Sequence, residues 1–180
     1  MSSSGAEPTQ RLFFALWPTG AVRDAVDRFA RQAIRKRAKR IPSEKLHITL
    51  AFAGSVTADV RDCLETGAER IAAEPFDLRI DTLGYWPRPR IIWAGPGQSP
   101  RAAWTLVKSL RELFLACELQ PEARAWQPHI TLARKAGRGL EATQMEPIDW
   151  SISDFCLVES VTDETGASYR ILRRWPLVGQ

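Results

Sequence analysis

The chain's only two histidines lie in two copies of one five-residue word. "HITLA" occupies His47 to Ala51 and occurs again at His129 to Ala133. At average residue frequencies, such a repeat arises by chance in only about a few per cent of chains of this length. Histidine gives or takes a proton near neutral pH, so one imidazole can act as acid while another acts as base. The repeat therefore indicates a functional pair of histidines rather than two structural ones.

A threonine follows each histidine by two residues, at Thr49 and Thr131. Because side chains alternate faces along a strand, histidine and threonine share one face, and the isoleucine and leucine of the word share the other. Two such strands related by a pseudo-twofold axis would place two imidazoles and two hydroxyls around one cavity.

In-line displacement at a phosphodiester suits this set of groups. The nucleophile and the leaving group lie on opposite sides of phosphorus, so one side needs a base and the other an acid. Threonine hydroxyls can donate hydrogen bonds to the nonbridging oxygens without adding another titratable group. A Ser/His/Asp hydrolase fits less well, because neither word contains a nucleophile elbow.

A metal centre or a disulfide scaffold is not expected from the cysteines. They are odd in number and have no C-x-x-C spacing, and neither histidine word contains a carboxylate. We therefore expect no metal and no cofactor. The three cysteines are Cys63, Cys117 and Cys156.

The elements that position the two words follow a repeated order. Short apolar runs predict strands at residues 11–18, 45–54, 76–86, 91–95 and 129–133, and "DFCLVESV" and "SYRILRRWPL" predict two more near the end. Apolar residues at three- and four-residue steps predict helices over residues 19–37, 57–74 and 99–117. The order strand, helix, histidine strand occurs twice. It predicts an α+β fold of two pseudo-symmetric lobes, each a mostly antiparallel sheet packed with helices, around a central groove.

Length and composition indicate one ordinary globular domain. The chain has 180 residues, of which 44% are hydrophobic and 26% charged. We expect a disordered tail over residues 1–10 and one two-lobed domain over residues 11–180. The longest strongly apolar run, "LFFALW", stops at Pro18, and no signal peptide is visible, so we expect a cytoplasmic protein that does not enter a membrane.

The positive charge is concentrated in one stretch. The net charge is +4, and "RQAIRKRAKR" at Arg31 to Arg40 contains basic residues but no acid. This stretch could be a solvated helix face, or it could contact phosphates beside the first histidine word. The sequence leaves both interpretations open.

The paired H-x-T-x motifs resemble those of the 2H phosphoesterase superfamily. "RLFFALWP", "KLHITLAFAG", "YWPRPRIIWAG" and "QPHITLAR" narrow the resemblance to the bacterial RNA 2',3'-cyclic phosphodiesterases, also called 2'-5' RNA ligases. The resemblance implies metal-independent hydrolysis of a terminal 2',3'-cyclic phosphate on RNA to a 2'-phosphate, and the joining of RNA ends through a 2'-5' linkage. It implies that His47 is the proton donor to the leaving oxygen and His129 the proton acceptor from water, with Thr49 and Thr131 on the phosphate.

Two further residues are candidates for substrate binding. Similar proteins have a basic residue at the position of Arg134 that helps to hold phosphate. Strict alternation would turn Arg134 away from His129, so this role requires the strand to bend or to end there. Phe14 could stack on a base or lie in the core. Arg88 and Arg90 could contact an RNA backbone or be ordinary surface charges.

The expected partner is RNA with a 2',3'-cyclic phosphate end, a tRNA-like molecule included, and the chain is expected to be a monomer. One alternative is a 2H phosphoesterase that acts on a small cyclic nucleotide or an ADP-ribose cyclic phosphate. Another is an RNA-end-binding module without catalysis.

Overall fold

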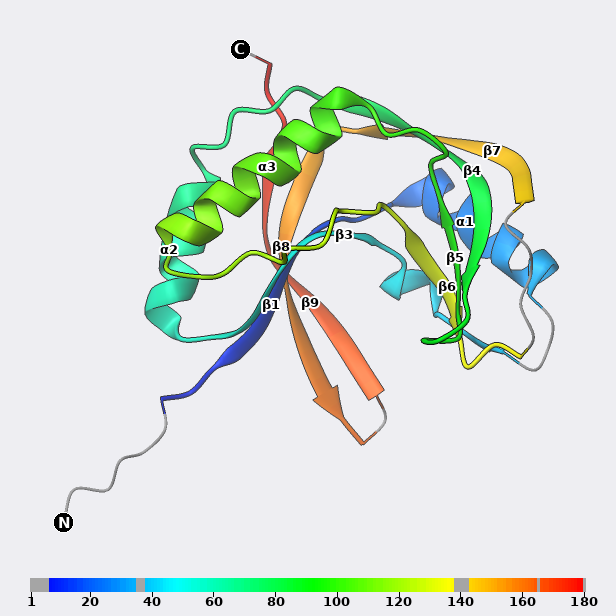
Figure 1. Cartoon of the computed structure of the whole chain (residues 1–180), viewed down its shortest axis with the longest axis horizontal. Helices are drawn as coiled ribbons and strands as arrows, with labels where there is room; N and C mark the ends of the chain where they lie inside the picture. Colours follow the sequence, from blue (N-terminus) through cyan, green and yellow to red (C-terminus); the bar gives the residue numbers. More distant parts are fainter. Residues whose placement is uncertain (1–6, 35–37, 138–142, 165, 180) are drawn as a thin grey trace.

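A nine-stranded antiparallel sheet organises the described part of the chain (Figure 1). The computed structural model describes residues 7–34, 38–137, 143–164 and 166–179. The strand order is β7-β4-β5-β6-β3-β1-β8-β9, and β2 pairs with β6 outside this path. The strands are β1 (Gln10–Leu16), β2 (Lys39–Arg40), β3 (Ile48–Val56), β4 (Phe76–Trp86), β5 (Ile91–Gly95), β6 (Ile130–Arg134), β7 (Thr143–Ile152), β8 (Asp154–Asp163) and β9 (Gly166–Pro176).

Three α-helices within the described ranges cover the sheet. α1 (Gly20–Ala33) packs on the half that contains β4 and β7, whereas α2 (Ala58–Ala68) and α3 (Arg101–Ala116) pack on the half that contains β1, β3 and β8 (Figure 1). A short 3-10 helix, η1 (Ser43–Lys45), leads into the first histidine word. The buried face of α3 follows helical spacing, and each fully buried leucine or phenylalanine contributes about 1.5–3 kcal/mol. That face includes Leu106, Leu110 and Phe114.

The two halves of the sheet meet where the two histidine words meet. β3 and β6 pair antiparallel through Ile48 opposite Ile130, the isoleucines of the two words. Equivalent residues lie opposite each other there, so a local twofold axis relates the two copies. The predicted α+β class with antiparallel pairing is confirmed. The two expected sheets, however, are one sheet, continuous through this pair.

A β-bulge occurs at the same place in each word. Between Thr49 and Ala51, β3 has one more residue than β1, and between Thr131 and Ala133, β6 has one more residue than β5. The extra residue is the leucine of "HITLA" in both copies. A bulge shifts the alternation of the side chains that follow it by one position. Residues beyond each bulge therefore point to faces that strict alternation does not predict.

The helices are shorter than the sequence predicts. α1 ends at Ala33, and the rest of its expected extension includes residues 35–37, which lie outside the described residues. α2 ends at Ala68 rather than Glu74. The expected tail over residues 1–10 falls largely on residues 1–6, also outside the described residues, and β1 already begins at Gln10. Within the described ranges, no helix is long and apolar enough to cross a membrane.

One pair of cysteines forms a disulfide, which the argument against a disulfide scaffold did not anticipate. Cys63 on α2 is bonded to Cys117 at the end of α3, with 5.9 Å between their Cα atoms. The two positions are 54 residues apart, and they meet because α2 packs against α3. Cys156 is a buried free thiol on β8.

Candidate active site

The two histidines are held in the same way at the entrance of β3 and of β6. Nδ1 of His47 lies 2.7 Å from the carbonyl oxygen of Lys45, and Nδ1 of His129 lies 2.8 Å from that of Gln127. A carbonyl oxygen only accepts hydrogen bonds, so Nδ1 carries the proton in each neutral ring. Nε2 is then the atom of each ring that is free to exchange a proton.

The strand register brings the four predicted polar residues together. Ile48 lies opposite Ile130, so extending this register by one residue sets Thr49 beside His129 and His47 beside Thr131. All four side chains line one groove of about 750 Å³. The site can therefore present two imidazoles and two hydroxyls to one bound group.

Arg134 also lines this groove. The bulge after Thr131 meets the requirement that the strand bend, because it returns the side chain of Arg134 to the face of His129. The charge of Arg134 lowers the pKa of both histidines, which shows that it acts on both rings. A guanidinium at this position can neutralise an anion held between the imidazoles.

The groove is strongly cationic. Lys39 and Arg40, at the end of the basic stretch, form β2 beside β6 rather than the end of a helix. Both line the groove, and no carboxylate lines it among the residues that the structure describes. This end of the stretch is part of the site, in line with phosphate contact rather than with a distant helix face. The other basic residues that line the groove are Arg11, Lys45 and Lys135.

His47 lies among aromatic rings that sequence reasoning missed. Trp17 stacks on the imidazole at 4.9 Å with an interplanar angle of 2°, and Phe13 and Tyr169 lie at 5.1 and 5.2 Å. Burial lowers the pKa of His47 to about 4; the hydrogen bond to Lys45 opposes this shift, and the charges of His129 and Arg134 add to it. The free site therefore holds His47 neutral at pH 7.

His129 is in a related but more open setting. Its ring contacts Trp86 edge to face at 4.5 Å. Burial is the largest cause that lowers the pKa of His129, and the charges of Arg124 and Arg134 also lower it, against the hydrogen bond to Gln127. Both imidazoles are thus neutral in the free site near pH 7.

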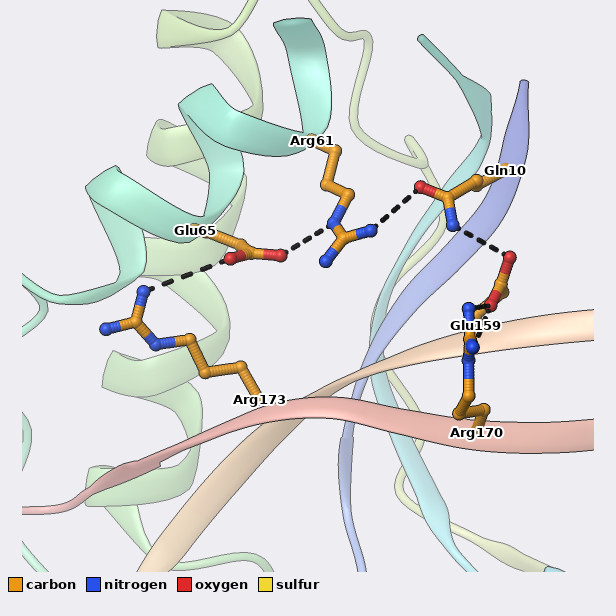
Figure 2. A network of polar contacts seen from close by, with 6 residues as sticks. All are labelled: Gln10, Arg61, Glu65, Glu159, Arg170 and Arg173. Atoms are coloured by element: carbon orange, nitrogen blue, oxygen red, sulfur yellow. Dashed lines mark hydrogen bonds and ion pairs between the residues drawn. The ribbon is translucent and has the colours of Figure 1, made fainter. Parts of the chain in front are cut away.

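A polar network holds the hairpin that carries Tyr169. Glu159 on β8 accepts hydrogen bonds from Gln10 and Arg170, and Arg61 on α2 links Gln10 to Glu65 (Figure 2). The hydrogen bond from Gln10 is the largest cause that lowers the pKa of Glu159, so this carboxylate stays ionised at neutral pH. The network ties β8 and β9 to β1 and α2, and it thereby fixes the strand that presents Tyr169 to His47.

Of the two alternatives for Phe14, stacking on a base is wrong and a position in the core is confirmed. Phe14 is 0% exposed and packs in the core against Phe114, Phe155 and Trp175. Its neighbour on the groove face is Phe13, because adjacent residues of a strand face opposite ways.

The exposed aromatic of the site is Phe52. It is 41% exposed, it lies beneath the guanidinium of Arg11 at 4.7 Å, and it lines the groove. Phe52 occupies in the first copy the position of Arg134 in the second, one residue beyond "HITLA".

The two surface arginines of the "PRPR" corner have different surroundings. Arg88 is exposed and lines a second cleft beside His129. Arg90 donates from Nε to the carbonyl oxygen of Ala136 at 2.9 Å, so it fastens the β4–β5 turn to the segment after β6. In the described part of the chain, no group of three or more histidine, cysteine or acidic side chains is arranged to hold a metal ion.

The fold and the paired histidine motifs are those of a class of phosphoesterases, and comparison with known sequences and structures identifies the family. The model of the 2'-5' RNA ligase superfamily matches residues 18–164, and the chain belongs to this family. The resemblance stated from the motifs is thereby confirmed.

Among curated relatives, the chain is 34% identical over 177 residues to the RNA 2',3'-cyclic phosphodiesterase of Escherichia coli, covering 96% of this chain and 98% of that protein. It is 30% identical to the RNA 2',3'-cyclic phosphodiesterase of Thermus thermophilus, covering 94% and 91%. The structure of E. coli LigT without ligand superimposes with a TM-score of 0.86 at 31% identity over 97% of this chain and 100% of that one. LigT complexed with 3'-AMP gives a TM-score of 0.84 at 30% identity over 95% and 99%.

Proposed function

We propose that this chain hydrolyses the terminal 2',3'-cyclic phosphate of RNA to a 2'-phosphate by two-histidine acid–base catalysis. The observation that carries the proposal is the register at Ile48 and Ile130, which gathers both histidine–threonine pairs in one groove. Its relatives in Escherichia coli and Thermus thermophilus bear the name of this activity. No metal takes part in the proposed reaction.

In the proposed step, water attacks phosphorus from the side of His129 and the ribose 3' oxygen leaves on the side of His47. Nε2 of His129 takes a proton from water as the new P–O bond forms, and Nε2 of His47 gives a proton to the 3' oxygen as its bond to phosphorus breaks. Thr49 and Thr131 donate hydrogen bonds to the nonbridging oxygens, and Arg134 offsets their charge. The leaving oxygen is the 3' oxygen, so the product is a 2'-phosphate.

His47 must become protonated when the substrate binds, because the free imidazole is neutral at pH 7. An anionic phosphodiester beside the ring favours the imidazolium. So does the parallel face of Trp17, which attracts a cation more than it attracts a neutral ring. These two effects support His47 as the donor.

RNA rather than a mononucleotide is the proposed substrate, since Lys39, Arg40 and Lys45 extend the positive groove beyond the histidines. We propose that the chain acts as a monomer and that it also joins RNA ends through a 2'-5' linkage, by the same step in which an RNA hydroxyl replaces water. Small nucleotides are a second candidate class. E. coli LigT forms complexes with 3'-AMP and with NADP+, which favours a site that accepts nucleotides without a polynucleotide chain.

The test is incubation with an RNA oligonucleotide that ends in a 2',3'-cyclic phosphate, with and without excess EDTA, followed by identification of the phosphate position. We expect a 2'-phosphate at equal rates in both conditions. A 3'-phosphate, or activity that EDTA abolishes and a divalent metal restores, would contradict the mechanism.

Comparing kcat/KM for this oligonucleotide and for 2',3'-cyclic AMP at two salt concentrations decides between the substrate classes. If the substrate is a polynucleotide, kcat/KM for the oligonucleotide should rise more at low salt than kcat/KM for 2',3'-cyclic AMP, because more of its phosphates contact the groove. Binding without turnover would instead support an RNA-end-binding module.

A further inference from the structure

A second cleft opens on the far side of His129. Its volume is about 1040 Å³, and its walls come from the β4–β5 turn around residues 87–89 and from the segment 121–127 between α3 and β6. Thr49, Phe52 and His129 line both this cleft and the first groove, whereas His47 lines only the groove. The two spaces therefore meet at His129 and not at His47.

The lining of the second cleft suits a nucleotide strand better than it suits water. Among the residues that the structure describes, Arg88, Arg111 and Arg124 contribute three positive charges, and Glu122 contributes one negative charge. Trp86 and Trp126 add aromatic surface, and bases stack on such rings. The volume is at the upper end of the range of about 300–1000 Å³ in which proteins bind small organic ligands. Hydrolysis needs only one water molecule at this position.

Hydrogen bonds fix the walls of the cleft. Nε1 of Trp126 donates to the carbonyl oxygen of Thr49 at 2.9 Å, and Nη2 of Arg111 donates to the carbonyl oxygen of Arg124 at 2.8 Å. The first bond ties the α3–β6 segment to the strand that carries the first histidine word. The second ties the same segment to α3. The cleft is therefore built before a ligand arrives, which lowers the cost of ordering it on binding.

We propose that this cleft binds the RNA strand that supplies a 5'-hydroxyl when two RNA ends are joined. This inference rests on the proposed function and adds to it the binding site of the second substrate. The attacking oxygen must approach phosphorus opposite the leaving 3' oxygen, on the side of His129. The second cleft is the space on that side. Phe52 lies at the junction of the two spaces, where its exposed ring can stack on a base.

The joining step balances without a further reactant. The 5' oxygen forms a bond to phosphorus as the bond to the 3' oxygen breaks. Nε2 of His129 takes the proton of the 5'-hydroxyl, and Nε2 of His47 gives one to the 3' oxygen. The products are a 2'-5' phosphodiester and a free 3'-hydroxyl, and the reverse of this step cleaves a 2'-5' linkage.

The experiment measures two reactions of each variant: hydrolysis of an oligonucleotide that ends in a 2',3'-cyclic phosphate, and joining of that oligonucleotide to a second one with a 5'-hydroxyl. We expect Arg88→Ala and Arg124→Ala to raise KM for the 5'-hydroxyl strand at least about fivefold, since each removes a phosphate contact worth about 1 kcal/mol or more. Each should also lower the slope of log KM against log salt by about 0.7. Arg28→Ala, which removes an exposed arginine of α1 outside both clefts, is the matched control.

A substitution that removes a negative charge instead of a positive one distinguishes weaker strand binding from loss of folding. Glu122 lies 3.4 Å from Arg124, so Glu122→Gln removes the negative charge of the cleft and frees this guanidinium. We expect it to lower KM for the 5'-hydroxyl strand. If Glu122→Gln and Arg124→Ala change this KM in the same direction, the cleft does not act through phosphate contacts and the inference fails.

The outcomes distinguish this inference from the proposed function. If Arg88→Ala impairs hydrolysis of the cyclic-phosphate oligonucleotide by as large a factor as it impairs joining, the cleft holds the chain of that oligonucleotide, and the inference is overturned. Arg124→Ala is left out of this comparison, because the charge of Arg124 also lowers the pKa of His129. If the wild-type chain hydrolyses the cyclic phosphate but neither joins ends nor cleaves a 2'-5' linkage, the inference fails while the proposed function stands. If it hydrolyses no cyclic phosphate, the proposed function fails first.

Discussion

The pH dependence of kcat/KM follows directly from the burial of the two histidines. This quantity reports the ionisation of the free enzyme, and the proposed mechanism requires one ring to be protonated while the other is neutral. The pKa of His47 is lowered to about 4 and that of His129 is lowered below 6.5. A coupled pair gives one bell-shaped curve whichever ring is the acid, with its maximum between the two values. The maximum is therefore expected below pH 6.5.

The expected size of the effect is large. Each pH unit above the upper pKa lowers the active fraction about tenfold, so kcat/KM at about pH 8.5 should be at least about a hundredfold below its maximum. The assay is hydrolysis of 2',3'-cyclic AMP at concentrations far below KM, from about pH 4.5 to about pH 9. Bound phosphodiester raises both pKa values, so the maximum of kcat is expected at a higher pH than that of kcat/KM.

Arg134→Gln tests one cause of the lowered pKa values of the two histidines. The charge of Arg134 lowers the pKa of both histidines, so its removal should move both limbs of the curve to higher pH. Burial is the larger cause and remains, so the movement should be less than about one unit. Arg28→Ala should leave the curve in place. A maximum of wild-type kcat/KM at or above pH 7, or a shift to lower pH in Arg134→Gln, would refute the reasoning.

Three further predictions concern individual groups. Replacing either histidine of the site by alanine should lower kcat by about two to four decades, measured on a cyclic-phosphate oligonucleotide, and turnover close to wild type would count against acid–base catalysis. Thr49→Val should lower kcat about a hundredfold by removing a donor to the phosphate, whereas Thr105→Val on the exposed side of α3 should not; equal rates for the two variants would exclude that role. Reduction of the Cys63–Cys117 disulfide, which closes a loop of 54 residues, should lower the free energy of unfolding by about 4 kcal/mol in urea titrations with and without dithiothreitol. A disulfide-free variant should not respond to dithiothreitol, and an unchanged midpoint for the wild-type chain would contradict the bond.

The regular elements with an apolar face could be predicted from the sequence, and the polar edge could not. β4 and β5 occupy the residues that their apolar runs predict. β7 was missed because it lies at the edge of the sheet, is only partly buried and contains Pro147. An edge strand tolerates a proline and needs little hydrophobic surface. The Cys63–Cys117 bond was missed for a different reason, since it depends on how two helices pack.

No local sequence pattern predicts which residues surround the two histidines. Trp17, Tyr169 and Trp86 contact the histidines from three strands or strand ends that are distant in sequence. Aromatic residues in apolar runs usually indicate core, and Trp17 ends such a run. The sequence could not decide between groove and core for Phe14, because two adjacent phenylalanines cannot be told apart without knowing which face of β1 meets the groove. The pairing of β1 with β3 decides this, and it selects Phe13.

The difference between the two copies begins just beyond the word that they share. Both words are identical through the alanine. A bulge at each leucine directs the side chain of the residue after that alanine into the groove. That residue is Phe52 in the first copy and Arg134 in the second, so one side of the groove offers a stacking surface and the other a cation. Identical motifs give no reason for one histidine to be the acid and the other the base. The residues around the two words do differ, because Trp17 stacks on His47 and His129 also lines the second cleft, from which the nucleophile comes in the proposed reaction. The division of labour is therefore expected to reside in the residues around the repeat.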